Sequence, residues 1–248
     1  MRVMPSQGVF LLRYSTRFFY EYQRSSCRRL GAGLNVFYRA MGMSFRLVVV
    51  SSEQDLPNET EAWEALREAG MTHLHLRKPH WNWMRTEDCL KRLSPELRAC
   101  VHLHDHHALA AHYGLGGVHL NARHPLPPSG YTGTVSRSCH GLDEVGRYKS
   151  ACEYVFLSPI FASISKRGYE AAFTPEALRE AAESGLIDGK VVALGGVTPA
   201  GLPALRALGF GGAAVLGALW RPYMACPEIK VLLAFWHDLR MAETVMEI

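Results

Sequence analysis

Three side chains that follow the run Tyr154–Leu157 carry the groups needed to bind a phosphate. The run is short and apolar and stops at Ser158-Pro159, as is typical of a strand buried on both faces. The segment beyond it contains Ser163, Ser165 and Lys166, which offer two hydroxyl donors and one positive charge. We predict that these residues hold phosphate oxygens. The alternative is a solvated loop whose side chains face water.

A second cation, Arg77, ends the histidine-rich run of residues 73–77. In a strand, alternation places His73, His75 and Arg77 on one face. An arginine at the end of a strand is a fork-shaped donor for a pyrophosphate or a carboxylate. We predict such a role for Arg77, and the alternative is a salt bridge at the protein's rim.

Asp105 follows a further histidine-rich run and is the candidate metal ligand. A single strand-end carboxylate suits Mg²⁺, whose remaining ligands are commonly waters and substrate phosphates. The pairs His73/His75 and His102/His104 also raise a zinc hydrolase site. Such a site needs another carboxylate late in the chain, and the last apolar run offers none. We therefore predict Mg²⁺ at Asp105, and we expect several histidines to be core residues bonded to backbone carbonyls.

Ser138 and His140 end another apolar run. The Ser138 hydroxyl can donate to a phosphate oxygen, and His140 is a candidate proton carrier because an imidazole titrates near neutrality. The neighbouring Cys139 could suggest a thiolate nucleophile. Adjacent strand residues point to opposite sides, so a Cys139–His140 pair is disfavoured.

Two glycine-rich turns late in the chain are suited to anion binding. They occupy residues 193–198 and 211–217 and contain Gly195, Gly196 and Gly217. Residues without side chains let backbone N–H groups approach an anion closely. We predict that these three glycines contact a phosphate.

The elements that position these groups are eight apolar runs separated by segments with helical spacing, such as the helix start at Thr174-Pro175. The runs are residues 46–50, 73–77, 100–104, 117–120, 133–138, 154–158, 190–194 and 212–216. They are too hydrophobic for a half-exposed antiparallel sheet. Eight strand–helix units in about two hundred residues predict an α/β fold, a single compact parallel (β/α)8 TIM barrel. An open doubly wound sheet is the alternative.

Composition places the chain among soluble globular domains. Its hydrophobic fraction is 48%, and no apolar run is long enough to cross a membrane. The net charge of +4 does not indicate nucleic-acid binding, because residues 1–40 carry seven Arg and one Glu and the remainder is slightly acidic. Six cysteines without a CxxC pair predict reduced thiols and a cytoplasmic protein. The sequence leaves the oligomeric state open, a homo-oligomer included.

Residues 1–42 are expected to lie outside the barrel domain, which we assign to residues 43–248. They are rich in Arg and Ser and lack apolar periodicity. One interpretation, which we favour, is a translated upstream region with the natural start at Met41 or Met43. The other is a targeting segment.

From about Phe45 to Trp220 the chain resembles the thiamine phosphate synthase and thiazole tautomerase superfamily. The matching stretches occur in family order and read HLHLRKP, LHDHHALA, GVHLNAR, SCHGLDE, YVFLSPIFASISK, VVALGGV and GFGGAAVLGAL. The resemblance implies a transferase that joins a pyrimidine diphosphate to a thiazole phosphate, with Mg²⁺ and with loss of pyrophosphate. Its partners would be these two small phosphorylated substrates.

The resemblance also implies roles for single residues. The pyrimidine diphosphate would be bound by Arg77, Ser138 and Lys166, and the thiazole phosphate would lie near Ser163, Ser165 and Gly195. Arg77 and Lys166 would act on the leaving group. In the tautomerase branch, His140 would move the proton.

Several positions depart from the family's pattern. His75 stands where the family usually has Gln, and the resemblance implies that it binds substrate there. Lys78 is displaced by one position, and His104 replaces the Asn that precedes the metal ligand Asp105. The second metal acid falls at Arg123 or His124, and the serine of the last strand falls at Gly217. We predict a thiamine phosphate synthase first, a thiazole tautomerase as the alternative, and a non-catalytic phosphate-binding paralogue as a third reading.

Overall fold

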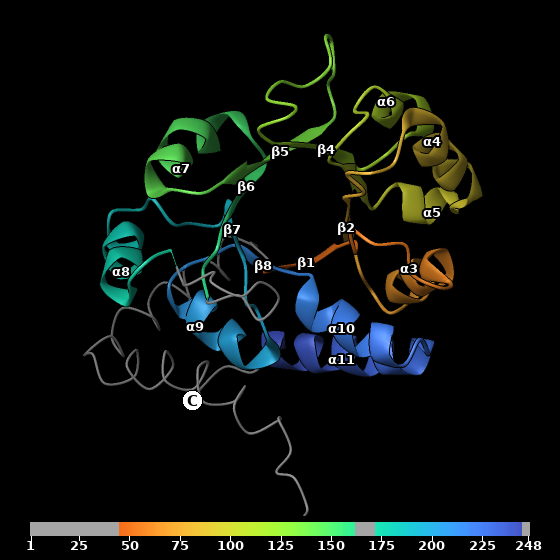
Figure 1. Cartoon of the computed structure of the whole chain (residues 1–248). Helices are drawn as coiled ribbons and strands as arrows, with labels where there is room; N and C mark the ends of the chain where they lie inside the picture. The colour runs from red at the N-terminus through yellow and green to blue at the C-terminus, as the bar shows by residue number, and fades with distance from the viewer. Residues whose placement is uncertain (1–44, 162–171, 245–248) are drawn as a thin grey trace, which may run out of the picture.

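The protein is a closed barrel of eight parallel strands that pair in chain order (Figure 1). The computed structural model describes residues 45–161 and 172–244. The strands are β1 (Arg46–Val50), β2 (His73–Leu76), β3 (Val101–Leu103), β4 (Gly117–Leu120), β5 (Thr134–Cys139), β6 (Tyr154–Leu157), β7 (Val191–Leu194) and β8 (Gly212–Val215). The predicted barrel is confirmed, and every strand end lies within one residue of its prediction.

Helices lie outside the ring of strands and cover its outer surface (Figure 1). They are α3 (Glu59–Glu68), α4 (Trp83–Arg92), α5 (Pro95–Arg98), α6 (Leu109–Tyr113), α7 (Leu142–Tyr148), α8 (Pro175–Glu183), α9 (Leu202–Ala207), α10 (Gly217–Ala225) and α11 (Ile229–Thr244), with 3-10 turns η1 (Lys149–Ala151) and η2 (Pro199–Gly201). Helix α8 begins as predicted, because the Thr174 side chain accepts from the Ala177 N–H and Pro175 occupies the first turn.

Strand alternation divides the buried side chains into two cores. Outward-facing residues such as Leu74 and Leu76 pack between the strands and the helices in the larger core. Inward-facing residues of β1, β6, β7 and β8, among them Val48, Tyr154 and Phe156, form the smaller core inside the barrel. This is the period-two pattern of a barrel whose interior is filled by side chains.

Histidines fill the opposite side of the barrel interior. His73 and His75 come from β2, His102 from β3 and His119 from β4, and His104 follows β3 directly. The rings of His75 and His102 stack with centroids 5.0 Å apart, and those of His104 and His119 with centroids 4.1 Å apart. The alternation predicted for β2 is confirmed, since both of its histidines face inward while its leucines face outward.

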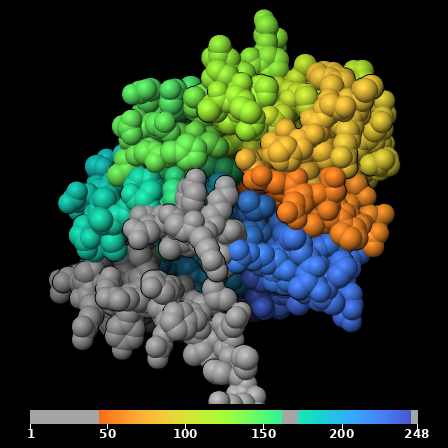
Figure 2. All heavy atoms as spheres, viewed as in Figure 1, coloured from red at the N-terminus to blue at the C-terminus, as the bar shows by residue number. Residues whose placement is uncertain are grey.

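The last two helices join the ends of the described chain. The Trp220 indole of α10 donates to the Val50 carbonyl of β1 over 2.7 Å. The Trp236 indole of α11 donates to the Ala69 carbonyl that ends α3, over 3.0 Å. Helices α10 and α11 therefore pack on the first strand–helix unit, and in Figure 2 their blue surface adjoins the orange surface of that unit.

Two sequence expectations concern the described chain as a whole. All five cysteines within it are free thiols, as predicted. No helix among the described residues is long and apolar enough to span a lipid bilayer.

A buried ion pair fixes the start of α3 against the loop after β2. The Lys78 ammonium lies 2.5 Å from the Glu59 carboxylate and donates to the Gln54 carbonyl over 2.7 Å. Both charged side chains are buried, and burial raises the pKa of Glu59 despite the adjacent ammonium. Lys78, the lysine displaced by one position from the family's pattern, is therefore committed to a structural contact.

Because the ion pair is buried, we expect removal of one partner to lower the stability of the fold strongly. The Glu59→Gln variant leaves the Lys78 ammonium buried without a counter-charge, so the free energy of unfolding should fall by about 3–5 kcal/mol in urea titrations. Glu61→Gln, an exposed carboxylate on the same helix, is the matched control and should change it by less than about 0.5 kcal/mol. Equal stability of the two variants would contradict a role for the pair.

Candidate functional site

Most of the predicted site residues within the described part of the chain gather at the carboxyl ends of the strands, whereas His75 lies deeper, fully buried inside the barrel. Because all eight strands run parallel, these ends open on one rim of the barrel, where barrel enzymes carry their active sites. The rim residues are Arg77 after β2, Asp105 after β3, Ser138 in β5, His140 after β5, Gly195 and Gly196 after β7, and Gly217 at the start of α10. Ser163, Ser165 and Lys166 lie outside the described residues, and their roles stay predictions.

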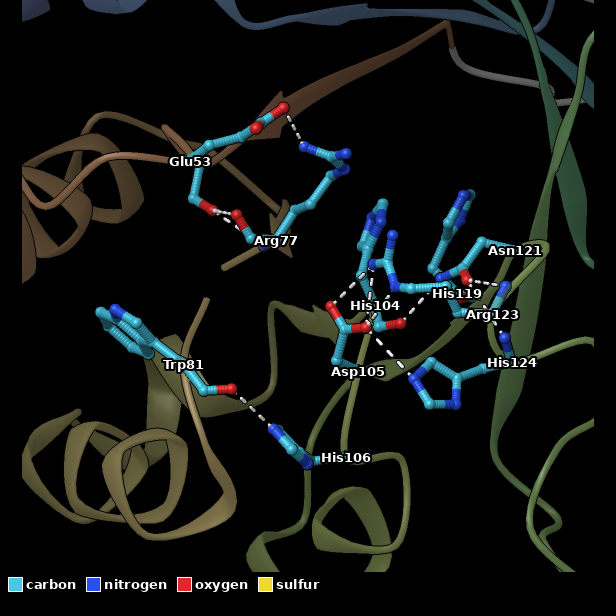
Figure 3. A network of polar contacts seen from close by, with 11 residues as sticks. Glu53, Arg77, Trp81, His104, Asp105, His106, His119, Asn121, Arg123 and His124 are labelled. Carbon is cyan, nitrogen blue, oxygen red and sulfur yellow. Dashed lines mark hydrogen bonds and ion pairs between the residues drawn. The ribbon is translucent and has the colours of Figure 1, made fainter. Parts of the chain in front are cut away.

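Arg77 is held in place by the loop after β1. Its backbone N–H donates to the Ser51 hydroxyl over 2.8 Å, and that hydroxyl donates to the Arg77 carbonyl over 3.2 Å. Its guanidinium forms an ion pair with Glu53 (Figure 3). The salt bridge at the rim, which was the alternative to anion binding by Arg77, is thus present. The side chain is half-buried, so an anionic ligand would have to compete with Glu53 for the guanidinium.

Asp105 is paired with two side chains from the turn after β4 (Figure 3). Arg123 Nη2 lies 2.8 Å from Oδ1 and 3.1 Å from Oδ2, and His124 Nε2 lies 3.2 Å from Oδ1. The Asn121 side-chain oxygen accepts from the backbone N–H groups of both residues, which fixes the turn. The guanidinium therefore lies where the family's second metal acid would be expected.

This arrangement fits Mg²⁺ poorly. Magnesium needs hard oxygen ligands, and the described residues bring it one carboxylate, whose two oxygens are both engaged by Arg123. The described residues show no group of three or more ligands that includes Asp105. The magnesium site at Asp105 stays a prediction.

A hydrogen-bonded network runs from the barrel interior to Ser138. His119 lies between two hydroxyls, with Nδ1 2.9 Å from Ser136 Oγ and Nε2 2.8 Å from Ser138 Oγ. His75 Nδ1 lies 3.0 Å from His104 Nε2, and His75 Nε2 lies 2.7 Å from the Tyr154 hydroxyl. The expectation of histidines bonded to backbone carbonyls holds for His102, whose Nδ1 lies 3.2 Å from the Cys100 carbonyl oxygen.

The imidazoles of this network are neutral. Burial lowers the pKa of His75, His104 and His119 well below its ordinary value, and the neighbouring imidazoles lower it further. Burial likewise lowers the pKa of His102 to about 4. A neutral imidazole presents one N–H donor and one lone pair. The ring nitrogen that faces Ser138 is therefore either a donor or an acceptor, which fixes the direction of that hydrogen bond.

His140 and Cys139 point apart, as predicted. Cys139 is buried in the outer core, and burial raises the pKa of its thiol to about 12. His140 is exposed, its Nδ1 lies 3.2 Å from the Ser158 hydroxyl, and its backbone N–H donates to Glu144. A thiolate–imidazole pair is therefore absent at these two residues, and His140 remains available for proton transfer.

The turn after β7 requires glycine. Gly195 and Gly196 have φ of 100° and 64°, and a Cβ on Gly195 would lie 2.9 Å from the Cα of Pro159. The loop after β6 runs along this turn, since the Phe161 N–H donates to the Gly195 carbonyl over 3.1 Å. Gly217 begins helix α10, so its N–H belongs to the end of the helix that attracts anions.

Sequence reasoning missed three contributors to the site: Arg123 as the partner of Asp105, and His119 and Tyr154 in the interior network. A signal for His119 was present, because it alternates with Val118 and Leu120 and must face inward if they face outward. The pairing of Arg123 with Asp105 joins two separate turns, and spacing within one turn does not reveal it.

Fold and site together define a closed parallel barrel with its charged and polar side chains collected at the carboxyl rim. Residues 47–219 match the model of the thiamine monophosphate synthase family, and the chain belongs to this family. A thiamine-phosphate synthase of Salinibacter ruber is 31% identical over 123 residues, which cover 46% of this chain and 52% of that protein. The match thus spans about half the length of that relative.

Solved structures agree with this assignment. A thiamine phosphate pyrophosphorylase from Bacteroides thetaiotaomicron superimposes with a TM-score of 0.72 at 37% identity, over 80% of this chain and 97% of that one. A thiamine phosphate pyrophosphorylase from Pyrococcus furiosus gives a TM-score of 0.64 at 19% identity, over 82% and 97% of the two chains. The second likeness concerns the fold alone.

The Asp105 contacts predict how a magnesium site could be made. Replacing Arg123 by Ala and His124 by Asp frees one carboxylate and adds a second, so Mg²⁺ should bind at least tenfold more tightly, about 1.4 kcal/mol, in calorimetric titrations. Adding Asp105→Asn to the double variant is the control and should remove the gain. Wild-type protein that binds Mg²⁺ as tightly as the double variant would show that Arg123 does not obstruct the cation.

Proposed function

We propose that the protein is a thiamine phosphate synthase, a transferase that couples hydroxymethylpyrimidine diphosphate to thiazole phosphate with release of pyrophosphate. Membership of the family and likeness to proteins named for this activity support the proposal. The observation that carries it is the set of fixed donors at the rim, namely the Arg77 and Arg123 guanidiniums and the Ser138 hydroxyl. Such donors suit a ligand that bears several phosphate oxygens.

The rim donors would act on the leaving group. When the bond between the pyrimidine methylene carbon and the diphosphate oxygen breaks, negative charge accumulates on the departing pyrophosphate. Arg77 and Ser138 would stabilise that charge in place, together with Lys166 if the loop after β6 brings it there. The thiazole nitrogen then captures the carbon cation, so no protein nucleophile is needed.

In this mechanism, the donors at the rim are oriented by contacts within the protein, which are present before the ligand binds. Glu53 and Ser51 orient Arg77, and the neutral His119 orients the Ser138 hydroxyl. Groups that are already oriented lose little freedom when the ligand binds. The thiazole phosphate would lie at Gly195, Gly196 and Gly217, whose backbone N–H groups can approach its oxygens.

A second function, thiazole tautomerisation, is favoured by a separate observation. His140 Nδ1 contacts the Ser158 hydroxyl, which can hold the ring while Nε2 exchanges a proton with a bound heterocycle. Isomerisation releases no pyrophosphate and makes no demand for paired metal acids. The poor fit of Asp105 to Mg²⁺ is therefore no obstacle to this reaction.

The synthase proposal predicts a strong dependence on Arg77. In an assay with both phosphorylated precursors, scored for coupled product, the Arg77→Ala variant should lose about a hundredfold or more in rate, equivalent to a few kcal/mol. Arg85→Ala, which removes an exposed guanidinium paired with Asp55, is the control and should retain the rate. Near-normal turnover by folded Arg77→Ala protein would refute the assignment of Arg77.

His140 separates the two reactions. If the protein is a synthase, His140→Asn should retain much of the coupling rate, because leaving-group electrostatics dominate that barrier. If it is a tautomerase, the same change should abolish isomerisation of a thiazole carboxylate phosphate, measured by NMR, while binding of inorganic phosphate persists. Isomerisation that needs His140 and ignores magnesium, with no coupling detected, would replace the first proposal by the second.

A further inference from the structure

Three histidines of the barrel interior form a cluster, of which only His119 enters the proposed synthase reaction, by orienting Ser138. His75 and His119 lie in β2 and β4, His104 follows β3, and all three side chains are buried. One ring nitrogen of each can be chosen so that all three atoms lie within 4.8 Å of one another. Among the described residues, this is the group of three whose possible ligand atoms lie close enough together to hold a metal ion.

The spacing is close to that of a bound cation. Two nitrogens that share a tetrahedral zinc ion lie about 3.3 Å apart, because each Zn–N bond is about 2.0–2.1 Å long. His75 Nδ1 and His104 Nε2 are already 3.0 Å apart, and their ring planes are inclined by 78°. A cation could therefore take the place of the proton that these two nitrogens share. The His119 ring stacks on the His104 ring with the two planes 23° apart, so it would have to rotate to direct a nitrogen at the same ion.

The hydrogen-bond partners of the three rings are those expected of metal-bound histidines. A metal-bound histidine usually gives its second nitrogen to a hydrogen-bond acceptor, which fixes the ring. His75 Nε2 has the Tyr154 hydroxyl at 2.7 Å. His119 has Ser136 at one nitrogen and Ser138 at the other, so a hydroxyl remains whichever nitrogen binds.

We propose that His75, His104 and His119 form a binding site for one divalent transition-metal ion, separate from Asp105. Three neutral imidazoles without a carboxylate favour Zn²⁺, Co²⁺ or Ni²⁺ over Mg²⁺ and Ca²⁺. Three-histidine sites leave a fourth position for water. The sequence raised zinc through the pairs His73/His75 and His102/His104, whereas this cluster takes one member of each pair and adds His119.

The proposal is independent of which thiamine-precursor reaction the protein catalyses, and its test measures binding alone. Full-length protein is stripped with a chelator, incubated with Zn²⁺ or Co²⁺ and separated from free metal. Wild-type protein should retain one equivalent of Zn²⁺ by elemental analysis. The Co²⁺ form should show the intense visible bands of a four-coordinate ion, and millimolar Mg²⁺ should not displace either metal.

Three single variants locate the site. His75→Gln and His104→Asn restore residue types that the family tolerates at these positions, and His119→Asn removes the third ligand. Each should weaken Zn²⁺ binding at least tenfold, with folding checked by circular dichroism, and one folded variant suffices for the test. His73→Asn, on the same strand and outside the trio, is the control and should bind as the wild type does.

Two results would overturn the proposal. One is wild-type protein that retains no Zn²⁺ or Co²⁺ after separation from free metal. The other is binding that all folded trio variants keep, or that His73→Asn weakens equally, since either would place the metal on other histidines.

Discussion

The hydrogen bonds among neutral histidines inside the barrel are the interaction on which the site depends. A buried imidazole without partners would be costly, and a charged one more so. Here the rings of β2, β3 and β4 satisfy one another and two serines, and their pKa values are lowered so that they stay uncharged. The same rings set the positions of the rim. Ser138 bonds directly to His119, Asp105 follows His104, and Arg77 lies one pleat beyond His75.

Charges at the rim are compensated before any ligand arrives. Arg77 is paired with Glu53, and Asp105 with Arg123 and His124. These pairs are half-exposed, so each is weak by itself and can exchange partners at little cost. An anionic ligand would therefore gain oriented guanidiniums but would have to displace carboxylates. The buried pair Lys78–Glu59 differs, because separating it would leave a charge without water, and it belongs to the scaffold.

Most of the fold could be predicted from the sequence, because each strand is a short apolar run bounded by polar or glycine residues, as in Tyr154–Leu157. The rim location of Arg77, Asp105 and Ser138 followed from strand ends in a parallel barrel. The hydrogen-bond and ion-pair partners of these side chains could not be predicted, because they depend on the register between strands. His75 pairs with His102 along the ladder but bonds to His104, and no spacing within either strand specifies this. Lys78 lies one residue after a rim arginine and yet is buried against helix α3, because Glu59 and Gln54 accept its hydrogen bonds.

The contacts of Trp220 with Val50 and of Trp236 with Ala69 join the last helices to the first strand–helix unit. During synthesis on the ribosome, β1 emerges long before β8 and α10, its neighbours in the finished barrel. Until β8 is synthesised, the edge of β1 that pairs with it stays unpaired, and unpaired edges are prone to wrong pairing in parallel sheets. Closure of the barrel therefore has to follow the synthesis of β8 and α10, after β2, β3 and β4 with their histidines have left the ribosome.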